Sequence, residues 1–312
     1  MTSIITLTIN PSIDVFTSVE KVAPNHKLRC ADVRRDPGGG GINAARVMRR
    51  FGADVIAVYP TGGALGELLR HLIDCEAIPT LTIPIAGETR EDFTMLETSS
   101  GRQYRFVLPG PRLTTEEWQR CLEAFASLAK GARFAVGSGS LPPGVPEDFY
   151  SRIAAVAKRS GTKIVIDSSG PALKAAVEAG VYLIKPSLRE FRSLIGGPLE
   201  SEQDCIAASR SLVARGQVEI VALTLGEQGA LLVTHDRVLR ARAVPIKPVS
   251  IVGAGDSFLG GMVWSLERGD ALEDAFRYGV AAGSAALLMP GTELSRREDV
   301  ERLLAEVEVT AI

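Results

Sequence analysis

The segment "TKIVIDSSGPALKAAVEAGVYLIKPS", residues 162–187, contains two short apolar runs on either side of a helical pattern. The runs within 162–170 and 181–187 are rich in β-branched residues and are the length of strands, so each predicts a buried strand. The intervening "PALKAAVEAG" predicts a helix. A strand, a helix and a strand in this order form a βαβ unit, whose strands are parallel and whose crossover is right-handed.

The same alternation continues in both directions along the chain. Further strands are predicted at residues 4–10, 54–60, 132–140 and 218–226, and further helices at 40–52, 64–77, 146–161 and 188–196. From residue 255 onward the pattern is helical, over 255–269, 271–289 and 297–307. The fold class is therefore predicted to be α/β, with a central, mostly parallel sheet flanked by helices.

Two segments interrupt this rhythm, residues 15–35 and 89–107. In the second, Phe93 and Met95 alternate with polar residues before "SSGR", and Tyr104 and Phe106 follow it, which predicts a hairpin with one covered face. We expect these segments to form a small β-lid on a body made of residues 1–14, 36–88 and 108–312. A hairpin without a functional role is the alternative.

The bulk composition excludes several classes of protein. A net charge of −2 over 312 residues gives no electrostatic basis for binding nucleic acid or a membrane surface. The start "MTSIITLTIN" lacks the pattern of a signal peptide, and no apolar run is long enough to span a bilayer, so a cytoplasmic location is expected. The four cysteines form no CxxC pair and the three histidines are scattered, which argues against zinc, disulfides and histidine-centred catalysis.

The run "PGGGGINAAR", residues 37–46, predicts a ligand site at a helix start. Consecutive glycines allow close approach to the backbone, and the N–H groups of a helix start favour anionic or oxygen-rich ligands. Asn43 adds a side-chain donor and acceptor. The run matches neither a dinucleotide-binding fingerprint after a buried strand nor a P-loop, and a flexible turn is the alternative.

The run "VGAGDSFLGG", residues 252–261, combines two glycines with a carboxylate at a helix start. Gly253 and Gly255 let successive N–H groups form an anion hole, which suits charge that develops on a phosphoryl group. Asp256 at its edge can accept a proton from an attacking hydroxyl, and phosphoryl transfer needs this combination. The alternative is that Asp256 only stabilises the dipole of its own helix.

Three other polar motifs, "NPSID" (10–14), "SGSLPPG" (138–144) and "KPSLRE" (185–190), follow predicted strands. Ligands of open parallel sheets bind beyond the carboxyl ends of the strands, so these motifs are candidates for the same site. Asp14 can accept hydrogen bonds from sugar hydroxyls, Lys185 can contact a phosphate and Glu190 can hold a metal-bound water. Turn or helix-cap roles are the alternatives for each.

Together the motifs resemble the phosphofructokinase B family of sugar kinases, which belongs to the ribokinase-like superfamily. "PGGGGINAAR" resembles its N-terminal signature and "SIVGAGD", residues 250–256, its C-terminal one. "TLTINPSID", "GRQYRFVLPG" and "GVAAGSAA" resemble the minor-type 6-phosphofructokinases of the family, while 1-phosphofructokinases typically carry a lysine in the first glycine run. The resemblance implies a ribokinase-like fold, a homodimer formed through the lid, and ATP- and Mg²⁺-dependent phosphorylation of the 1-hydroxyl of fructose 6-phosphate in glycolysis.

The resemblance also implies roles for individual residues. Asp256 is the implied base, and Gly253, Ala254 and Gly255 the anion hole. The implied sugar-phosphate contacts are Asp14, Lys27, Arg29, Gly38, Gly39, Gly40, Asn43, Arg90 and Ser140, with Arg90 on the 6-phosphate and Lys27 and Arg29 as helpers. The implied nucleotide contacts are Lys185, Ser187, Thr224, Gly226, Gly229 and Ser284. Glu190 is implied to bind Mg²⁺ through water, and Ser250, Val252, Ala286 and Gly291 to surround a monovalent cation, K⁺.

The chain departs from the family pattern at a few positions. The N-x-x-E motif has Ser187 in place of asparagine, Ser250 and Ile251 replace D-T, and Met289 and Glu293 differ near the cation loop. Tagatose 6-phosphate kinase and 1-phosphofructokinase stay open as alternatives within the same class of enzyme. A sugar-phosphate-binding regulator without activity is a third, motivated by Ser187. The residues themselves predict an acid beside anion holes, and fructose is implied by the resemblance alone.

Overall fold

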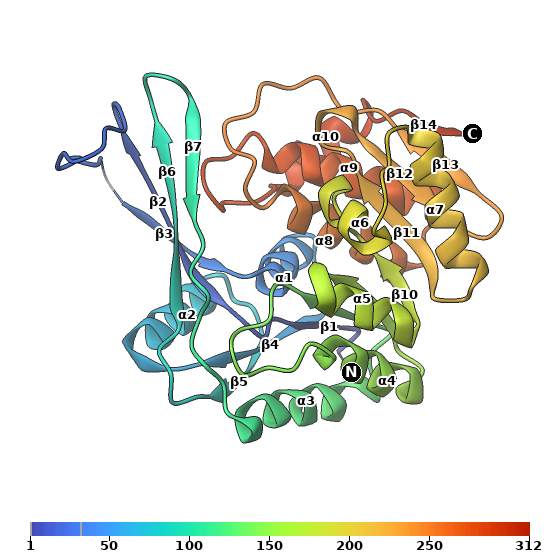
Figure 1. The fold of residues 1–312 in the computed structure, drawn as a ribbon, viewed down its shortest axis with the longest axis horizontal. Helices are drawn as coiled ribbons and strands as arrows, with labels where there is room; N and C mark the ends of the chain where they lie inside the picture. The colour runs from blue at the N-terminus through green and yellow to red at the C-terminus, as the bar shows by residue number, and fades with distance from the viewer. Residues whose placement is uncertain (1, 32) are drawn as a thin grey trace.

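A ten-stranded sheet runs through the body of the protein in the computed structural model, which describes residues 2–31 and 33–312 (Figure 1). The strand order is β14-β13-β12-β11-β10-β9-β8-β1-β4-β5. The parallel strands are β1 (Ile4–Leu7), β4 (Val55–Thr61), β5 (Thr80–Pro84), β8 (Phe134–Ser138), β9 (Lys163–Asp167), β10 (Val181–Ile184) and β11 (Val218–Thr224). The segment 162–187 forms β9, α5 and β10, and Val165 pairs with Leu183 in parallel, as predicted.

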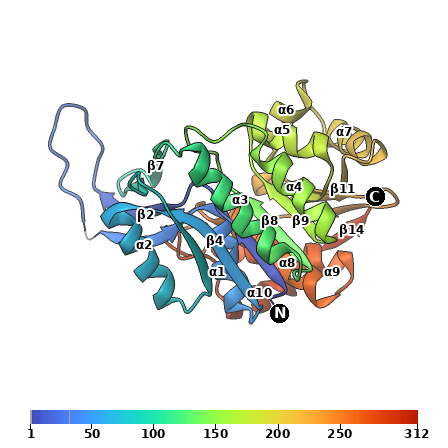
Figure 2. The same cartoon turned by 90° about the horizontal axis from the view of Figure 1, so that it is seen from below.

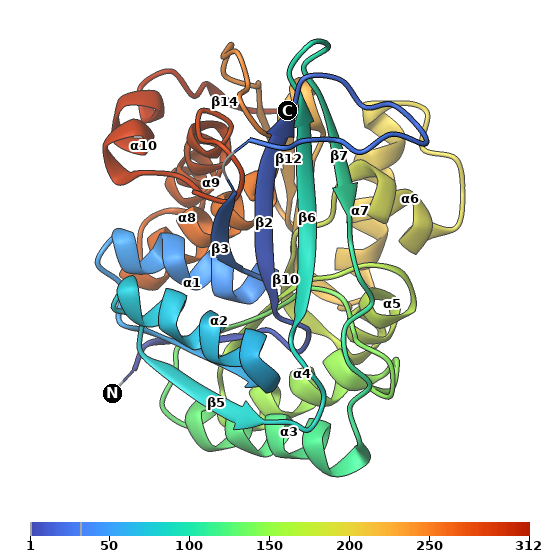
Figure 3. The ribbon, with the colours of Figure 1, turned by 90° about the vertical axis from the view of Figure 1, so that its left-hand side faces the viewer.

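Helices cover both faces of this sheet because successive strand residues point to opposite sides. Along β9, Val165 belongs to one apolar cluster and Ile164 and Ile166 to the other. The first cluster is covered by α1 (Gly40–Arg50), α2 (Gly63–Cys75), α8 (Ala254–Arg268), α9 (Leu272–Ala286) and α10 (Arg297–Leu304). The second is covered by α3 (Thr115–Ala129), α4 (Phe149–Ser160), α5 (Gly170–Ala179), α6 (Leu188–Ile195) and α7 (Glu202–Ala214). These two layers are visible on either side of the sheet in Figure 3.

A separate four-stranded sheet, which we call the lid sheet, stands beside the body (Figures 1 and 3). It has the order β3 (Arg34–Gly38), β2 (Ser12–Val19), β6 (Arg90–Glu97) and β7 (Arg102–Phe106). The hairpin predicted within 89–107 is confirmed as β6 and β7, in which Phe93 pairs with Phe106. The sheet also reaches further into the body than the expected boundaries, because Ser12 pairs with Gly38 and Asp14 with Asp36.

The connection between β2 and β3 extends away from the body, at the far left of Figure 2. The opposite edge of the large sheet is antiparallel and is made of β12 (Ala230–Val233), β13 (Val238–Ala241) and β14 (Val309–Ala311). A single 3₁₀ turn, η1 (Gly226–Gln228), leads from β11 into this edge. Within the described ranges, no helix has both the length and the apolar character needed to cross a membrane.

Candidate active site

A cleft of about 450 Å³ lies where the carboxyl ends of the parallel strands meet the base of the lid sheet. Its walls carry both signs of charge. The carboxylates are Asp14, Asp92, Asp167, Glu190 and Asp256, and the cations are Arg90, Arg105 and Lys185. Backbone from both predicted glycine runs completes the lining, at Gly39, Gly40, Gly253 and Gly255. A site with cations, carboxylates and free N–H groups suits a ligand that carries phosphate and hydroxyl groups.

Asp256 lies in the first turn of α8, which begins directly after Gly253. Gly253 has a left-handed backbone with φ of 76°, a conformation that glycine adopts without strain. Burial raises the pKa of Asp256 above its ordinary value, and a hydrogen bond from Asn43 and the charge of Lys185 oppose this rise. The Asn43 Nδ2 donates to Asp256 Oδ2 at 2.9 Å. The Asp256 carboxyl group thus lies at the positive end of a helix and is held by a neutral amide.

The first glycine run places a second helix start beside Asp256. Gly39 caps α1, and Gly40 lies so close to the Ser138 hydroxyl that a Cβ at this position would collide with it. The same Cβ would lie 3.1 Å from an oxygen of Asp256. Only glycine therefore lets the start of α1 approach the start of α8, and both positive helix ends face the cleft.

Asp14 lies on β2 at the base of the lid sheet. Its Oδ1 accepts a hydrogen bond of 2.8 Å from the Ser12 hydroxyl, and Gly38 packs against its carboxylate. Burial raises the pKa of Asp14 to about 6; the Ser12 hydrogen bond opposes the rise and the charge of Asp92 adds to it. Asp14 is therefore ionised at neutral pH and able to accept hydrogen bonds from ligand hydroxyls.

Arg90 crosses the junction between the lid sheet and the body. Its guanidinium donates to Asp92 Oδ1 at 2.9 Å, to the Leu108 carbonyl at 2.7 Å and to the Asn10 carbonyl at 3.2 Å. Its Nε is buried and has no hydrogen-bond partner among the residues that the structure describes. These bonds fix the guanidinium at the edge of the cleft, where it can meet an anion.

Arg105 and Asp92 line the cleft but were not predicted from the sequence. The signal that would have found them is the two-residue period of the hairpin. Asp92 pairs with Asp14 across β2 and β6, and Thr94 pairs with Arg105 across β6 and β7. Asp14, Asp92 and Arg105 therefore share the face of the lid sheet that looks into the cleft.

On the far side of the cleft, Lys185 follows β10 and forms an ion pair of 3.2 Å with Asp167. Burial raises the pKa of Asp167 to about 7, although the charge of Lys185 opposes it. Burial alone would lower the pKa of Lys185, but the charges of Asp167, Asp256 and Glu190 outweigh burial and raise it. Lys185 is thus held as a cation among carboxylates, ready to meet a phosphate.

Ser187, which departs from the family pattern, caps helix α6. Its hydroxyl accepts from the Glu190 N–H at 3.3 Å, and Glu190 Oε2 accepts from the Ser187 N–H at 2.8 Å. This reciprocal capping box satisfies donors that the start of a helix leaves free. Serine is therefore able to hold both the helix start and the Glu190 carboxylate at the cleft.

Similarity to known proteins shows the family to which the chain belongs. The profile of the pfkB family of carbohydrate kinases matches residues 3–299. The chain belongs to this family. It is 46% identical over 299 residues to ATP-dependent 6-phosphofructokinase isozyme 2 of Mycobacterium tuberculosis (strain ATCC 25618 / H37Rv), covering 96% of this chain and 88% of the relative. It is 33% identical to the 1-phosphofructokinase of Bacillus subtilis (strain 168), covering 99% of this chain and all of the relative.

A solved structure also supports membership of the pfkB family. The phosphofructokinase-2 of Escherichia coli, crystallised in complex with potassium, superimposes with a TM-score of 0.93 at 39% identity, covering 98% of this chain and 99% of the other. Membership of the pfkB family makes the chain a phosphotransferase with an alcohol group as acceptor, and implies ATP as donor and usually Mg²⁺. It also confirms the predicted α/β fold, with its mostly parallel sheet and flanking helices.

Several residues that the resemblance assigned lie outside the cleft of this pfkB kinase. Lys27 and Arg29 are exposed on the extension between β2 and β3, and Ser140 is exposed and bonded to Asn10. Gly226 begins the turn that follows Thr224 and Gly229 ends it, whereas Thr224 itself lines the cleft. Ser284 is on α9, next to a Gly283 whose Cβ would lie 3.2 Å from the Ala254 carbonyl.

The residues proposed for a monovalent cation lie along two segments that meet beside α8. The Val249 N–H donates to the Leu287 carbonyl at 2.7 Å, which joins the loop of Ser250 and Val252 to the end of α9 at Ala286. Val252 also lines the cleft. Gly291 lies further along and packs against Phe16 of the lid sheet.

Glu293, one of the two residues near the cation loop that differ from the family pattern, contacts the lid sheet directly. Its Oε2 accepts from Arg34 Nη1 at 2.6 Å, and Arg34 also pairs with Asp36 at 2.8 Å. The loop after α9 is therefore attached to β3 by an ion pair.

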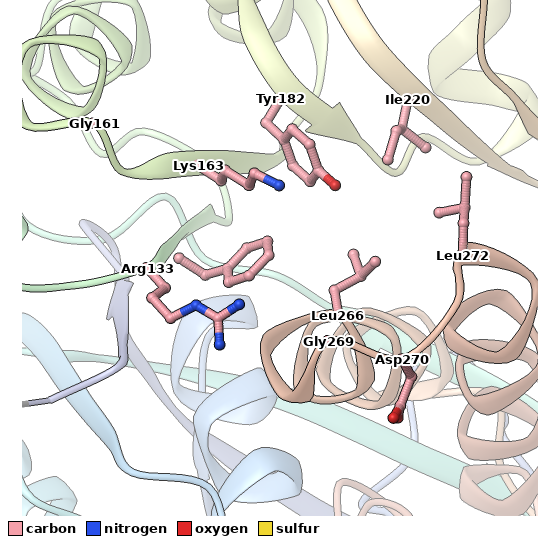
Figure 4. A pocket seen from close by; sticks show the side chains of 10 residues that line it. Arg133, Gly161, Lys163, Tyr182, Ile220, Leu266, Gly269, Asp270 and Leu272 are labelled. Carbon is pink, nitrogen blue, oxygen red and sulfur yellow. The ribbon is translucent and has the colours of Figure 1, made fainter.

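A second cavity, also of about 450 Å³, lies at the amino ends of β8 to β11 (Figure 4). Lys163 Nζ lies 4.6 Å from the centre of the Tyr182 ring, Arg133 lies at the rim, and Asp270 accepts from the Ser265 hydroxyl. Its lining includes neither of the glycine runs. It has a carboxylate, Asp270, beside the start of α9, but no glycine run that could form an anion hole for a phosphoryl group, so the cleft at the lid sheet is the candidate active site.

The carboxylates of the cleft fit a magnesium ion that arrives with a nucleotide. No group of at least three His, Cys, Asp or Glu residues that could hold a metal ion is found in the part of the chain that the structure describes. Mg²⁺ usually keeps several waters and binds through one or two carboxylates together with substrate phosphates. Glu190, with Asp167 nearby, would meet such an ion through its waters.

Proposed function

We propose that this chain is an ATP-dependent 6-phosphofructokinase that phosphorylates the 1-hydroxyl of fructose 6-phosphate to give fructose 1,6-bisphosphate. The observation that carries this proposal is the arrangement of the cleft. Asp256 and two helix starts occupy its floor, Asp14 occupies one wall, and Arg90 and Arg105 lie at the base of the lid sheet. A sugar on Asp14 with its 6-phosphate toward the arginines would present its far end to Asp256.

In the proposed reaction Asp256 accepts the proton of the 1-hydroxyl as the sugar oxygen attacks the γ-phosphorus of ATP. The bond between that phosphorus and the bridging β–γ oxygen breaks, and ADP leaves. The N–H groups of Gly253, Ala254 and Gly255 would stabilise the charge on the transferred group. Bound Mg²⁺ would supply additional positive charge to the phosphates.

The remaining wall of the cleft would bind the nucleotide. Lys185 is positioned for its phosphates, Ser187 fixes Glu190, and Thr224 continues toward the turn of Gly226 and Gly229. Ser284, on the helix that packs against the start of α8, would border the same site. Because the reaction consumes ATP, we expect it to take place in the cytoplasm, where ATP is available.

K⁺ is proposed at the junction of the 250–252 loop and the end of α9. The support is that the two segments are hydrogen-bonded there and that the E. coli relative was crystallised with potassium. A cation at this place would lie behind Gly253 and stabilise the anion hole.

We also propose a homodimer formed through the lid sheet. The face of this sheet that looks away from the cleft exposes Phe93 and Phe106, which are 39% and 55% exposed. Exposed aromatic residues on a sheet face are typical of a protein interface. Lys27 and Arg29 are exposed and belong to the connection between β2 and β3, which extends away from the body in Figure 2. They would therefore act on the sugar phosphate held by a partner.

The test is a coupled assay with fructose 6-phosphate, tagatose 6-phosphate and fructose 1-phosphate, each with ATP and Mg²⁺. We expect kcat/KM to be highest for fructose 6-phosphate. A preference for either other sugar would identify the tagatose 6-phosphate kinase or the 1-phosphofructokinase instead. Absence of turnover with all three at every Mg²⁺ concentration would favour a regulator.

The variant Asp256→Asn tests the proposed role of Asp256 as the base. It should retain the melting temperature and the binding of fructose 6-phosphate but lose several orders of magnitude in kcat, because an amide cannot accept the proton. Turnover close to that of the unaltered enzyme would remove Asp256 from its proposed role.

A further inference from the structure

Arg46 is a fully buried cation on α1, with 1% of its surface exposed. Its Nη1 donates to the Pro37 carbonyl at 3.0 Å, to the Asn43 Oδ1 at 3.2 Å and to the Thr292 carbonyl at 2.9 Å. Its Nε donates to Glu76 at 2.7 Å. The guanidinium thus joins the lid strand β3, the start of α1, the loop after α9 and the end of α2, without lining the cleft.

The bond to Asn43 matters because a carboxamide has one accepting end and one donating end. When Arg46 holds the oxygen, the Nδ2 group is left to donate to Asp256 at 2.9 Å. If the amide rotated by half a turn, its oxygen would face the carboxylate of Asp256. That arrangement would repel the ionised base and would favour its protonated form.

We propose that Arg46 is a positioning residue, which fixes the orientation of the Asn43 amide so that Asp256 stays ionised and able to accept the substrate proton. This inference rests on the proposed kinase function. The charge of Arg46 acts in the same direction, since it also lowers the pKa of Asp256 and of Asp14. Geometry and charge thus both work through Asp256, although Arg46 has no contact with the cleft.

Apart from Asn43, several charged groups also face Asp256, and a substitution of Arg46 leaves these groups unaltered. They are Lys185 after β10, Asp167 on β9, Glu190 on α6, Arg105 on β7 and Asp14 on β2. Lys185 and Arg105 favour the ionised form of Asp256, and Asp167 opposes it by repulsion between like charges. A change in the titration of Asp256 in an Arg46 variant therefore reports the loss of Arg46 against a constant background.

The surroundings of Arg46 also indicate that an Arg46→Met variant folds. Glu76, its charge partner, stays paired with Arg50, whose Nη2 lies 3.1 Å from Glu76 Oε2. Methionine preserves most of the buried volume of the arginine stem. The matched control is Arg49→Met, because Arg49 is exposed on the same helix and bonds only to the Ala77 carbonyl among the described residues.

The experiment compares Arg46→Met, Asn43→Ala, the double variant and Arg49→Met. The first readout is kcat as a function of pH with saturating fructose 6-phosphate and Mg·ATP. We expect Arg46→Met to lower kcat about ten- to a hundredfold and to move the acid limb upward by about one pH unit. In the Asn43→Ala background the same change should have a clearly smaller effect, because only the charge of Arg46 and no longer the orientation of the amide is then lost.

The second readout is the titration of the Asp256 carboxyl by ¹³C NMR, which needs no turnover. An upward shift in Arg46→Met, with Arg49→Met unchanged, supports the inference. It is overturned if Asp256 titrates as in the unaltered protein, or if the losses in kcat are additive, even when Arg46→Met is less stable. Absence of turnover in the unaltered protein would contradict the proposed function, and the NMR titration would still test Arg46.

Discussion

At the scale of single residues, the cleft holds carboxyl groups whose ionised forms are disfavoured by burial. Burial raises the pKa of Asp14 to about 6, so its carboxylate is destabilising at neutral pH. A group whose pKa is raised in the folded state contributes stability below its unfolded pKa and loses it as the pH rises through the folded value. We therefore expect Asp14→Asn, which cannot ionise, to exceed the unaltered protein by about 2 kcal/mol in free energy of unfolding at about pH 7.5.

The Asp14→Asn comparison is made by urea unfolding between about pH 2.5 and pH 7.5. The difference should vanish only below about pH 3, where Asp14 is protonated in both states. If the variant were instead the less stable protein at neutral pH, the carboxylate would be stabilised by Arg105 and Arg46 more than burial disfavours it.

Arg90 is expected to bind the 6-phosphate of the substrate. Removing a charged hydrogen-bond donor costs about 1.5–3 kcal/mol, so Arg90→Ala should raise KM for fructose 6-phosphate roughly ten- to a hundredfold. Steady-state kinetics with fructose 6-phosphate and with free fructose provide the measurement, and Arg112→Ala, exposed and outside the cleft, is the control. Equal weakening for both sugars would show that Arg90 does not contact the phosphate.

The candidate site could be predicted where a residue carries its own chemical signal. Asp256 and Asn43 follow glycine runs, and Asp14 follows a strand, so their residue types and positions were sufficient. Arg105 and Arg46 gave no such signal, because the first depends on cross-strand pairing in the lid sheet and the second on carbonyls from distant segments. Lys27 and Arg29 were assigned by resemblance alone, and their exposure in this chain leaves their role to the proposed dimer.

At the scale of elements, Ser187 shows how a departure from a family pattern can keep a function. The capping box of α6 predicts that Ser187→Ala lowers the free energy of unfolding by about 1 kcal/mol, whereas Ser187→Asn retains it, since asparagine is an equally good cap. Loss of the cap also frees Glu190, so KM for Mg·ATP should rise in Ser187→Ala. Thermal unfolding and Mg·ATP kinetics measure the two effects, and an unchanged KM would exclude Glu190 from the nucleotide site.

Helices and strands could be predicted where their apolar residues recur with a regular period. The strands β8 to β11 and the helices α4, α5 and α6 between them were predicted because short buried runs alternate with amphipathic helices, whereas α7 was not predicted. The antiparallel edge β12 to β14 was not, because β14 joins β13 from the far end of the chain and its partner cannot be identified from local pattern. The lid sheet was only partly predicted for the same reason, since β2 pairs with β6 across more than seventy residues of sequence.

At the scale of the whole molecule, the lid sheet connects the cleft to an exposed apolar face. One face carries Asp14, Asp92 and Arg105, and the other carries Phe93 and Phe106. Dimer formation on the outer face would hold the sheet against the body, and would bring Lys27 and Arg29 of each chain toward the cleft of the other. Affinity for the sugar phosphate should therefore depend on oligomeric state.

This dependence is tested by the double variant Phe93→Asp and Phe106→Asp, which buries two carboxylates in any lid–lid contact. We expect a monomer by light scattering, because unpaired buried charges strongly oppose association, and a raised KM for fructose 6-phosphate at unchanged melting temperature. Ile312→Asp is the control, since Ile312 is 56% exposed at the opposite edge of the large sheet. A double variant that stays dimeric would place the interface elsewhere, whereas a monomer with unchanged KM would show that each cleft is complete within one chain.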